Sequence, residues 1–250
     1  MKLSSWNEMV MPLIGLGTWN LRGRECTKVV KLALELGYHH IDTAAVYDNH
    51  VAVGKGIKNF PREQLFLTSK LSMDDVDPKQ VEKSVEKAIS RVLKELNIDY
   101  VDLLLIHWPD RSRPLPRIFQ TMAQELETKR VRFAGVSNFN VHHLQDMLDA
   151  GCKISANQVE FHPYLSQKNL YDFCKSQEIQ LISYRPLGKG ALLENPLFHQ
   201  IGQKHGKTPA SSNRSKAWED PSSSHLALDC PKGTSRHPQS LLKRTSSRKF

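Results

Sequence analysis

Short apolar runs alternate along most of this chain with segments whose apolar residues recur at helical spacing. The runs that read as strands are seven: 11–18, 38–42, 65–70, 101–108, 131–138, 154–161 and 179–188. Helical patterns fall between them, most clearly over 25–37, 78–96, 141–149 and 167–177. Alternation of this kind predicts parallel strands that are joined by crossover helices.

The strongest helical pattern covers 78–96, where Lys and Glu fill the polar face. Its apolar stripe consists of Val81, Val85, Ile89, Val92 and Leu96. Asp77 suits the N-cap and Pro78 the first helical position, so we expect the helix to begin there. In the pattern over 25–37, Gly37 takes the C-cap position. The apolar face of that second helix is expected to be Val29, Ala33 and Leu36.

Two architectures fit such an alternation, an open doubly wound sheet and a closed eight-stranded barrel. An open dinucleotide-binding sheet carries three glycines after its first strand. Here Gly15 and Gly17 are present, but Asn20 stands where the third glycine belongs. No G-x-x-x-x-G-K-[ST] loop occurs either. We therefore favour an α/β (β/α)₈ barrel.

Polar residues follow the apolar stretch at the end of six predicted strands. They are Asp42, Lys70, His107, Ser137 with Asn138, Gln158 and Tyr184. Singly, each has an ordinary explanation: Asp42 as a helix cap, Lys70 as a solvated charge, His107 as a core histidine, and the others as turn or rim residues. In a barrel, however, these strand ends meet on the face where active sites lie. One shared site explains all six better than six separate accidents.

The residue types suit proton transfer to a carbonyl oxygen. Tyr47 follows Asp42 by five residues, and an unperturbed phenol has a pKa near 10, too high for an efficient acid at neutral pH. A nearby ammonium such as Lys70 favours the phenolate, and a buried lysine needs a counter-charge such as Asp42. His107 could then hydrogen-bond the carbonyl oxygen and orient it.

The chain resembles the aldo-keto reductases. The motifs that carry the resemblance are "GLGTW", "GYHHIDTAAVYDN", "LTSKL", "VDLLLIHWP", "GVSNF", "NQVEFHPY", "ISYRPLG" and "HGKTPA", in order over about residues 11–210. The compact form is similar to bacterial reductases of 2,5-diketo-gluconate and methylglyoxal. The resemblance implies a (β/α)₈ barrel that uses NADPH, bound across the barrel mouth, to reduce an aldehyde or ketone.

The resemblance also implies roles for individual residues. Asp42, Tyr47, Lys70 and His107 match the catalytic tetrad, with Tyr47 as the proton donor. The cofactor-binding residues implied are Thr18, Asp42, Ser137, Asn138, Gln158, Tyr184, Leu187 and Gly188, with Tyr184 stacked on the nicotinamide. Substrate contacts are implied for Trp19, Tyr47, His107 and Trp108.

Composition and charge narrow the class of protein further. The net charge is +9, of which residues 211–250 carry +5, from eight Lys or Arg against three acids. This basic excess lacks a recognition motif, so we expect no specific nucleic-acid partner. No apolar run is long enough for a membrane span, and the N-terminus has no secretory pattern. The scattered cysteines, Cys26, Cys152, Cys174 and Cys230, favour reduced thiols in a cytoplasmic protein without a metal site.

The resemblance stops at Ala210, and residues 211–250 form a basic tail in which ten of forty residues are serine. Such a composition is typical of disordered segments, and a shifted reading frame or an alternative terminus would produce it. We therefore expect a barrel domain over 1–210 whose eighth strand and helix are missing or replaced, followed by a disordered or loosely docked tail. "SHLALDC" (224–230) is the one candidate for the missing strand.

Two functions remain open at this point. One is an active carbonyl reductase that works as a monomer on a small-molecule substrate. The other is a truncated or frameshifted noncatalytic chain that retains the tetrad and binds NADPH weakly. If the tail completes the barrel, Lys232 and Arg236 become the candidates for contacts to the 2′-phosphate. The pocket loops decide the identity of the substrate, which the sequence leaves open.

Overall fold

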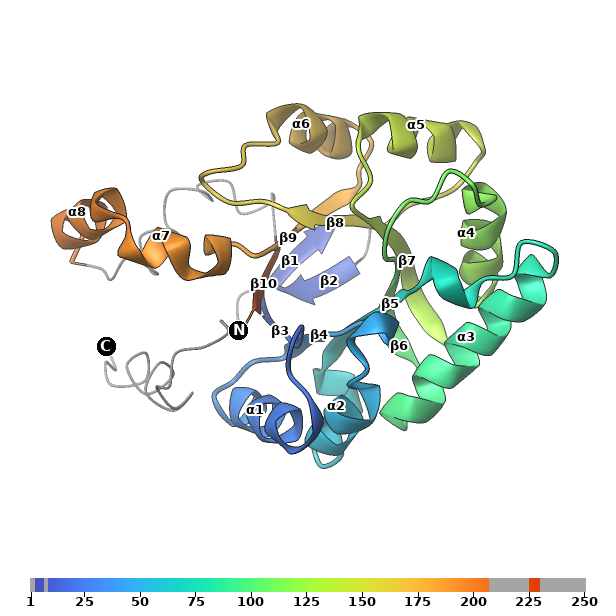
Figure 1. Ribbon diagram of the computed structural model, residues 1–250, viewed down its shortest axis with the longest axis horizontal. Helices are drawn as coiled ribbons and strands as arrows, with labels where there is room; N and C mark the ends of the chain where they lie inside the picture. Colours follow the sequence, from blue (N-terminus) through green and yellow to red (C-terminus); the bar gives the residue numbers. More distant parts are fainter. Residues whose placement is uncertain (1–2, 7–8, 207–224, 230–250) are drawn as a thin grey trace.

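A closed barrel of eight parallel strands forms the centre of the molecule (Figure 1). The computed structural model describes residues 3–6, 9–206 and 225–229. Around the barrel the strands run in the order β3 (Ile14–Gly17), β4 (His40–Asp42), β5 (Phe66–Leu71), β6 (Val101–Ile106), β7 (Val131–Ser137), β8 (Ala156–Glu160), β9 (Gln180–Tyr184) and β10 (His225–Asp229). The barrel and its seven predicted strands are confirmed.

Helices cover the outside of the barrel, while α7 and α8 extend to one side of it (Figure 1). The described helices are α1 (Gly23–Glu35), α2 (His50–Ile57), α3 (Val81–Leu96), α4 (Leu115–Gln124), α5 (Val141–Asp149), α6 (Lys168–Ser176), α7 (Ala191–Glu194) and α8 (Pro196–Lys204). Short 3₁₀ turns are η1 (Ala45–Tyr47), η2 (Arg62–Gln64), η3 (Met73–Asp75) and η4 (Gly188–Gly190). None of the helices in this part of the chain is both long and apolar enough to cross a membrane.

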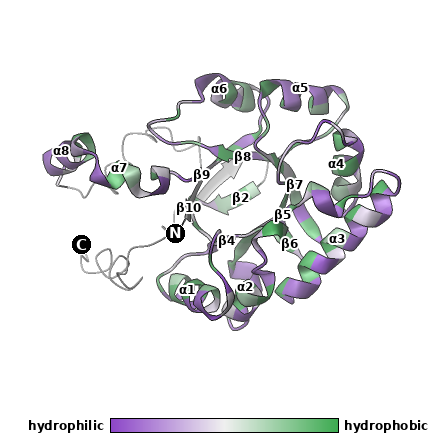
Figure 2. Cartoon of the chain, viewed as in Figure 1, coloured by the Kyte–Doolittle hydropathy of each residue, from purple (hydrophilic) through white to green (hydrophobic). Residues whose placement is uncertain are grey.

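The predicted apolar stripes face the barrel, with two corrections. All five stripe residues of α3 are buried, and Figure 2 shows polar residues on the outer side of the helix. The helix begins at Val81 after the N-cap Gln80, however, and not at Pro78. Asp77 instead accepts a hydrogen bond from the backbone of Lys79 at 2.9 Å, so its carboxylate holds a turn. On α1, Leu36 is 38% exposed and serves as the C-cap instead of joining the apolar face.

An antiparallel hairpin of β1 (Leu3–Trp6) and β2 (Met9–Pro12) precedes the barrel, and the sequence patterns did not predict it. Met9 and Met11 of this hairpin are fully buried in a cluster with inward-facing barrel residues such as Leu103 and Leu105. The hairpin therefore supplies apolar side chains to the barrel interior.

The eighth place in the barrel is taken by β10, from the segment that the sequence offered as the one candidate. Leu226 pairs with Ile14 of β3 and with Ser183 of β9, both in parallel. The sequence predicts that the eighth strand is either missing or replaced. The structure shows a strand in the eighth position. Of the two alternatives for the tail, disorder or loose docking, residues 225–229 form a docked strand, and the rest of the segment 211–250 lies outside the described residues.

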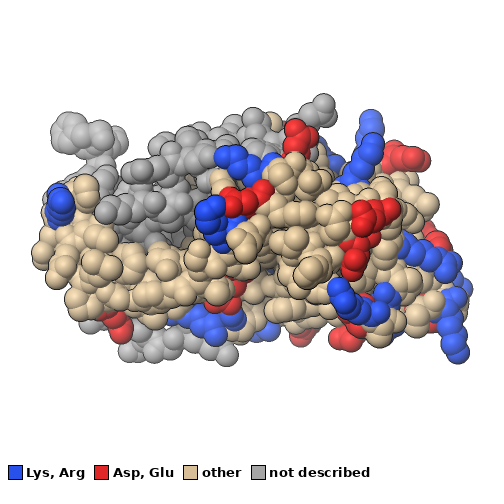
Figure 3. Space-filling view, turned by 90° about the horizontal axis from the view of Figure 1, so that it is seen from above, with Lys and Arg blue, Asp and Glu red and all other residues tan. Residues whose placement is uncertain are grey.

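Charged groups of both signs are interspersed on the face of the described residues that Figure 3 shows. Lys and Arg side chains there lie next to Asp and Glu, so this face carries no broad field of one sign. Cys26, Cys152 and Cys174 are buried free thiols, and burial raises the pKa of all three. Cys230 lies outside the described residues.

His40 fills the barrel interior beneath the predicted site. Its Nε2 lies 3.0 Å from the hydroxyl of Thr68, and a Cβ on Gly15 would lie only 2.4 Å from its Nδ1. Gly15 therefore makes room for this imidazole, which explains one glycine of the G-x-G pair without a phosphate. Burial, with a smaller effect from the charge of Lys70, lowers the pKa of His40 to about 3.

The integrity of the barrel can be tested at β10. Ala227 pairs with Gly15 on one side and with Tyr184 on the other, so a proline there removes an N–H from a ladder with neighbours on both sides. We expect Ala227→Pro to lower the free energy of unfolding by about 1–3 kcal/mol or more, measured by urea denaturation. Ala227→Ser, which retains the N–H, is the matched control. Equal unfolding midpoints in the two variants would contradict closure by β10.

The buried His40 predicts a loss of stability in acid. The folded protein keeps His40 neutral down to about pH 3, whereas the unfolded chain takes up a proton near pH 6.5. Its contribution to stability is therefore complete above pH 6.5 and is lost as the pH falls from there towards 3. His40→Gln should make the urea midpoint less dependent on pH over this window.

Candidate active site

The strand ends named in the sequence analysis converge at one mouth of the barrel. Side chains along each strand alternate between the barrel interior and the helical layer. On β4 and β5 this alternation turns Asp42 and Lys70 inward, whereas Ile41 and Leu71 pack in the outer core. Two charged groups therefore end up facing each other at the carboxyl ends of neighbouring strands.

Asp42 and Lys70 form a buried ion pair, with side chains only 4% and 1% exposed. The Lys70 ammonium also donates to the backbone carbonyl of Thr43 at 3.0 Å. The second carboxylate oxygen of Asp42 accepts from Nε2 of Gln158 at 2.7 Å. Burial opposes the charge of Lys70, but Asp42 and then Tyr47 outweigh it, so the pKa of Lys70 is raised. The site thus holds a permanent ammonium out of water.

Tyr47 reaches this ammonium from η1, the turn that follows β4. The Lys70 nitrogen lies 5.2 Å from the centroid of the Tyr47 ring, and a hydrogen bond with Tyr47 is among the causes that raise the pKa of Lys70. The ring of His107 meets that of Tyr47 edge to face at 5.7 Å. Phenol, ammonium and imidazole therefore share one side of the barrel mouth.

His107 follows β6 directly, and its backbone N–H donates to the carbonyl of Leu71 at 3.1 Å. Burial, and secondarily the charge of Lys70, lowers the pKa of His107 to about 3. The imidazole is therefore neutral at ordinary pH. It can donate one hydrogen bond and accept another, but it brings no second positive charge into the site.

A hydrogen-bonded group of polar side chains forms a further part of the wall. Ser137 donates from its hydroxyl to the carbonyl of Gln158 at 2.8 Å. The amide nitrogen of Asn138 donates to the carbonyl of His107 at 2.9 Å, and its amide oxygen accepts from the Tyr184 hydroxyl at 2.9 Å. Asn138 has a φ of 65°, a left-handed backbone that an asparagine tolerates better than most residues.

These residues line one cavity of about 330 Å³. Its walls consist of Trp19, Asp42, Val46, Tyr47, His107, Trp108, Ser137, Asn138, Gln158, Glu160, Tyr184 and Arg185. Larger cavities lie outside the barrel, one of about 500 Å³ between α1, α2 and α3 and one of about 590 Å³ between α2 and α3. We assign the chemistry to the smaller one because the converging ionisable groups line it.

Four predicted residues lie outside the cavity wall. Lys70 is buried beneath it and reaches Asp42. Thr18 donates from its hydroxyl to the backbone carbonyl of Asp42 at 2.9 Å, so it fixes the end of β4. Leu187 and Gly188 belong to the turn after β9, where Gly188 has a φ of 54°.

The sequence analysis missed three wall residues. Val46 precedes Tyr47 in η1. Arg185 pairs with Glu160 at 3.2 Å, and its guanidinium lies 4.9 Å from the centroid of the Trp19 ring. Glu160 ends β8 and Arg185 follows β9 directly, so the rule of polar residues at strand ends would have found both.

Within the described ranges, no group of three His, Cys, Asp or Glu side chains is placed to hold a metal ion. The mouth brings together a phenol next to a buried ammonium, a neutral imidazole, and a polar wall with an aromatic ring.

A profile of the Aldo/keto reductase family matches residues 13–234, which extends beyond Ala210. Glyoxal reductase of Bacillus subtilis is 44% identical over 208 residues, covering 82% of this chain and 74% of that protein. Methylglyoxal reductase DkgA of Escherichia coli is 37% identical over 212 residues, covering 80% and 73%.

Solved structures agree with the sequence comparison. A crystal structure of an aldo/keto reductase from Brucella melitensis superposes with a TM-score of 0.85 and 31% identity, covering 100% of this chain and 94% of the other. Family profile, relatives and structure thus point the same way, and the chain belongs to the aldo/keto reductase family of oxidoreductases.

Proposed function

We propose that this protein reduces aldehydes and ketones to alcohols with NADPH, and that Tyr47 donates the proton. The observation that carries the proposal is the buried Lys70 ammonium, held by Asp42 and within reach of the Tyr47 phenol. A cation in this position favours the phenolate and so makes Tyr47 a stronger acid near neutral pH. The names of the relatives, glyoxal reductase and methylglyoxal reductase, support small carbonyl compounds as the substrates.

Each side chain of the pocket has a separate role in the proposed reaction. His107, as a neutral imidazole, donates a hydrogen bond to the substrate carbonyl and holds its oxygen next to the Tyr47 hydroxyl. Trp19 and Trp108 bound the pocket as apolar walls. As hydride reaches the carbonyl carbon, Tyr47 gives its proton to the oxygen, and Lys70 stabilises the phenolate that remains. Asp42 keeps Lys70 charged throughout.

The residues present fit a nicotinamide at this mouth. Tyr184 offers a ring to the cavity, and amide and hydroxyl groups of Ser137, Asn138 and Gln158 lie on the same wall, where they can hold a carboxamide. When bound, the reduced cofactor supplies the hydride and leaves as NADP⁺. We propose the loop of Leu187 and Gly188, with Thr18, as further cofactor contacts. Lys232 and Arg236 lie outside the described residues.

We further propose that the enzyme works as a cytoplasmic monomer. One chain supplies all four members of the tetrad, and its described cysteines are buried free thiols, which suits a reducing compartment. The alternative, a noncatalytic chain that binds NADPH weakly, predicts no turnover. Steady-state reduction of methylglyoxal with NADPH, together with titration of NADPH binding, separates the two possibilities.

The role of Tyr47 is tested by Tyr47→Phe, which removes the proton donor and retains the ring. We expect a loss of at least about a hundredfold in kcat for methylglyoxal, the lower range for general acid catalysis, and little change in NADPH affinity. Tyr100→Phe is the control, since Tyr100 stacks between Arg62 and Arg132, away from the cavity. Near-normal turnover of Tyr47→Phe would remove Tyr47 from the mechanism.

The role of Tyr184 as the stacking ring is tested by Tyr184→Ala, with Tyr184→Phe as its matched control. Loss of the ring should weaken NADPH binding by roughly 1–3 kcal/mol, as for other aromatic stacking platforms. Phenylalanine retains the ring and loses the hydrogen bond to Asn138, so its dissociation constant should stay near that of the parent. Fluorescence titration measures both, and equal affinity of the alanine variant and the parent would contradict stacking.

A further inference from the structure

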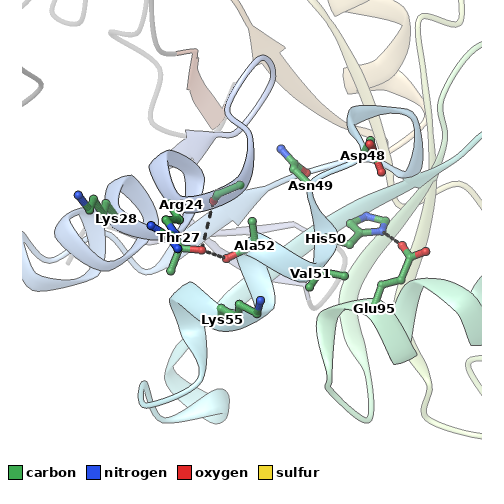
Figure 4. A pocket seen from close by; sticks show the side chains of 11 residues that line it. Arg24, Thr27, Lys28, Asp48, Asn49, His50, Val51, Ala52, Lys55 and Glu95 are labelled. Carbon is green, nitrogen blue, oxygen red and sulfur yellow. Dashed lines mark hydrogen bonds and ion pairs between the residues drawn. The ribbon is translucent and has the colours of Figure 1, made fainter.

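His50 is a buried histidine that the proposed chemistry does not use. It is the first residue of α2 and only 2% exposed. Its Nδ1 lies 2.9 Å from Oε2 of Glu95 on α3, and its Nε2 lies 3.0 Å from the hydroxyl of Ser69 on β5. Figure 4 shows His50 and Glu95 facing each other among the residues that line the outer cavity of about 500 Å³. Both ring nitrogens of this histidine therefore have a defined partner.

The positions of these partners connect His50 to the tetrad. Ser69 directly precedes Lys70 on β5, and the alternation of side chains points Ser69 to the helical layer and Lys70 to the barrel mouth. His50 follows Tyr47 by three residues, across the left-handed Asp48. One hydrogen bond thus joins the segment that carries the phenol to the strand that carries the ammonium.

The charge states fix the direction of these hydrogen bonds. A carboxylate oxygen accepts, so Nδ1 of His50 carries the proton and donates to Oε2 of Glu95. The neutral ring then accepts at Nε2 from the Ser69 hydroxyl. Burial lowers the pKa of His50 despite the opposing effect of Glu95, which agrees with this neutral tautomer.

The neighbouring Asn49 anchors the same turn in another direction. Its amide nitrogen donates to the carbonyls of Thr18 and Leu21, and its amide oxygen accepts from the hydroxyl of Thr43 at 2.7 Å. Asn49 therefore ties the turn to the loops after β3 and β4. Of these two adjacent residues, His50 makes the side-chain bond to the strand that holds Lys70.

We propose that His50 is a positioning residue for the reduction: through Ser69 it holds the Tyr47 segment at the distance from Lys70 that makes the phenol a usable acid. This inference rests on the proposed roles of Tyr47 and Lys70. Without the bond, the turn shifts away from β5, the ammonium acts less on the phenol, and Tyr47 becomes a weaker acid. The proposed cofactor contacts of Ser137, Asn138 and Tyr184 stay as they are.

Two pairs of substitutions isolate the bond to Ser69. In His50→Asn the amide can replace Nδ1 towards Glu95 but cannot reach Ser69. In His50→Gln the longer amide can replace Nε2 towards Ser69. Ser69→Ala removes the hydroxyl itself. Asp102→Asn is the control for stability, because Asp102 is a buried carboxylate that holds Arg62 and the backbone of Leu67, away from the cavity.

We expect His50→Asn and Ser69→Ala to lower kcat for methylglyoxal roughly tenfold to a hundredfold, as small misplacements of catalytic groups do. The alkaline limb of the pH profile of kcat should move to higher pH, since a phenol less affected by Lys70 keeps its proton longer. His50→Gln should retain most of the activity and the parent profile. NADPH affinity should remain unchanged in all three variants.

The inference is overturned if His50→Asn and Ser69→Ala lose stability as Asp102→Asn does while kcat and the alkaline limb remain those of the parent. It is also overturned if NADPH affinity falls in step with kcat, or if His50→Gln and His50→Asn are equally impaired. Ionisation of Tyr47 can be followed without turnover, by ultraviolet titration of tyrosinate against Tyr47→Phe. An inactive parent protein would therefore refute the proposed function and still leave the effect of His50 on Tyr47 measurable.

Discussion

The arrangement at the barrel mouth depends on one buried ion pair. Moving an ammonium out of water costs several kcal/mol, and a single carboxylate repays this only when further hydrogen bonds complete the geometry. Lys70 donates such bonds to Asp42 and to the carbonyl of Thr43, and Asp42 in turn accepts one from Gln158. A charge held in this way persists at neutral pH, so every group within reach must respond to it.

The closed barrel is what allows this pair to exist. Gln158 and Asp42 lie 116 residues apart in the chain, and their side chains meet because β4 and β8 turn the same ends towards one mouth. The strands near the site are short, with three residues in β4 and five in β10, so they need neighbours on both sides to hold their register. Closure by β10 therefore bears directly on the chemistry and not only on stability.

Sequence patterns were sufficient for the barrel and for most of the site because both depend on local signals. An apolar run followed by a polar residue indicates the end of a buried strand, and this signal located Asp42, Lys70 and Gln158. Features that depend on contacts between distant elements carry no such signal. Met9 and Met11 of the hairpin are buried through contacts with residues of distant strands, and His50 bonds to Ser69 on β5 and to Glu95, 45 residues later.

Lys70 and His107 are two basic side chains at the mouth whose protonation states differ because their neighbours differ. Burial disfavours the charged form of both Lys70 and His107. Lys70 keeps its proton because a carboxylate lies against it. Among the described residues, no carboxylate pairs with the ring of His107, and the charge of Lys70 disfavours a second cation beside it. The same pocket therefore holds one fixed charge and one neutral donor, and the neutrality of His107 comes first from burial and second from the charge of Lys70. In the proposed reaction, a carbonyl oxygen at this mouth would meet a hydrogen-bond donor from His107 and an acid from Tyr47, without competition from a second ammonium-like group.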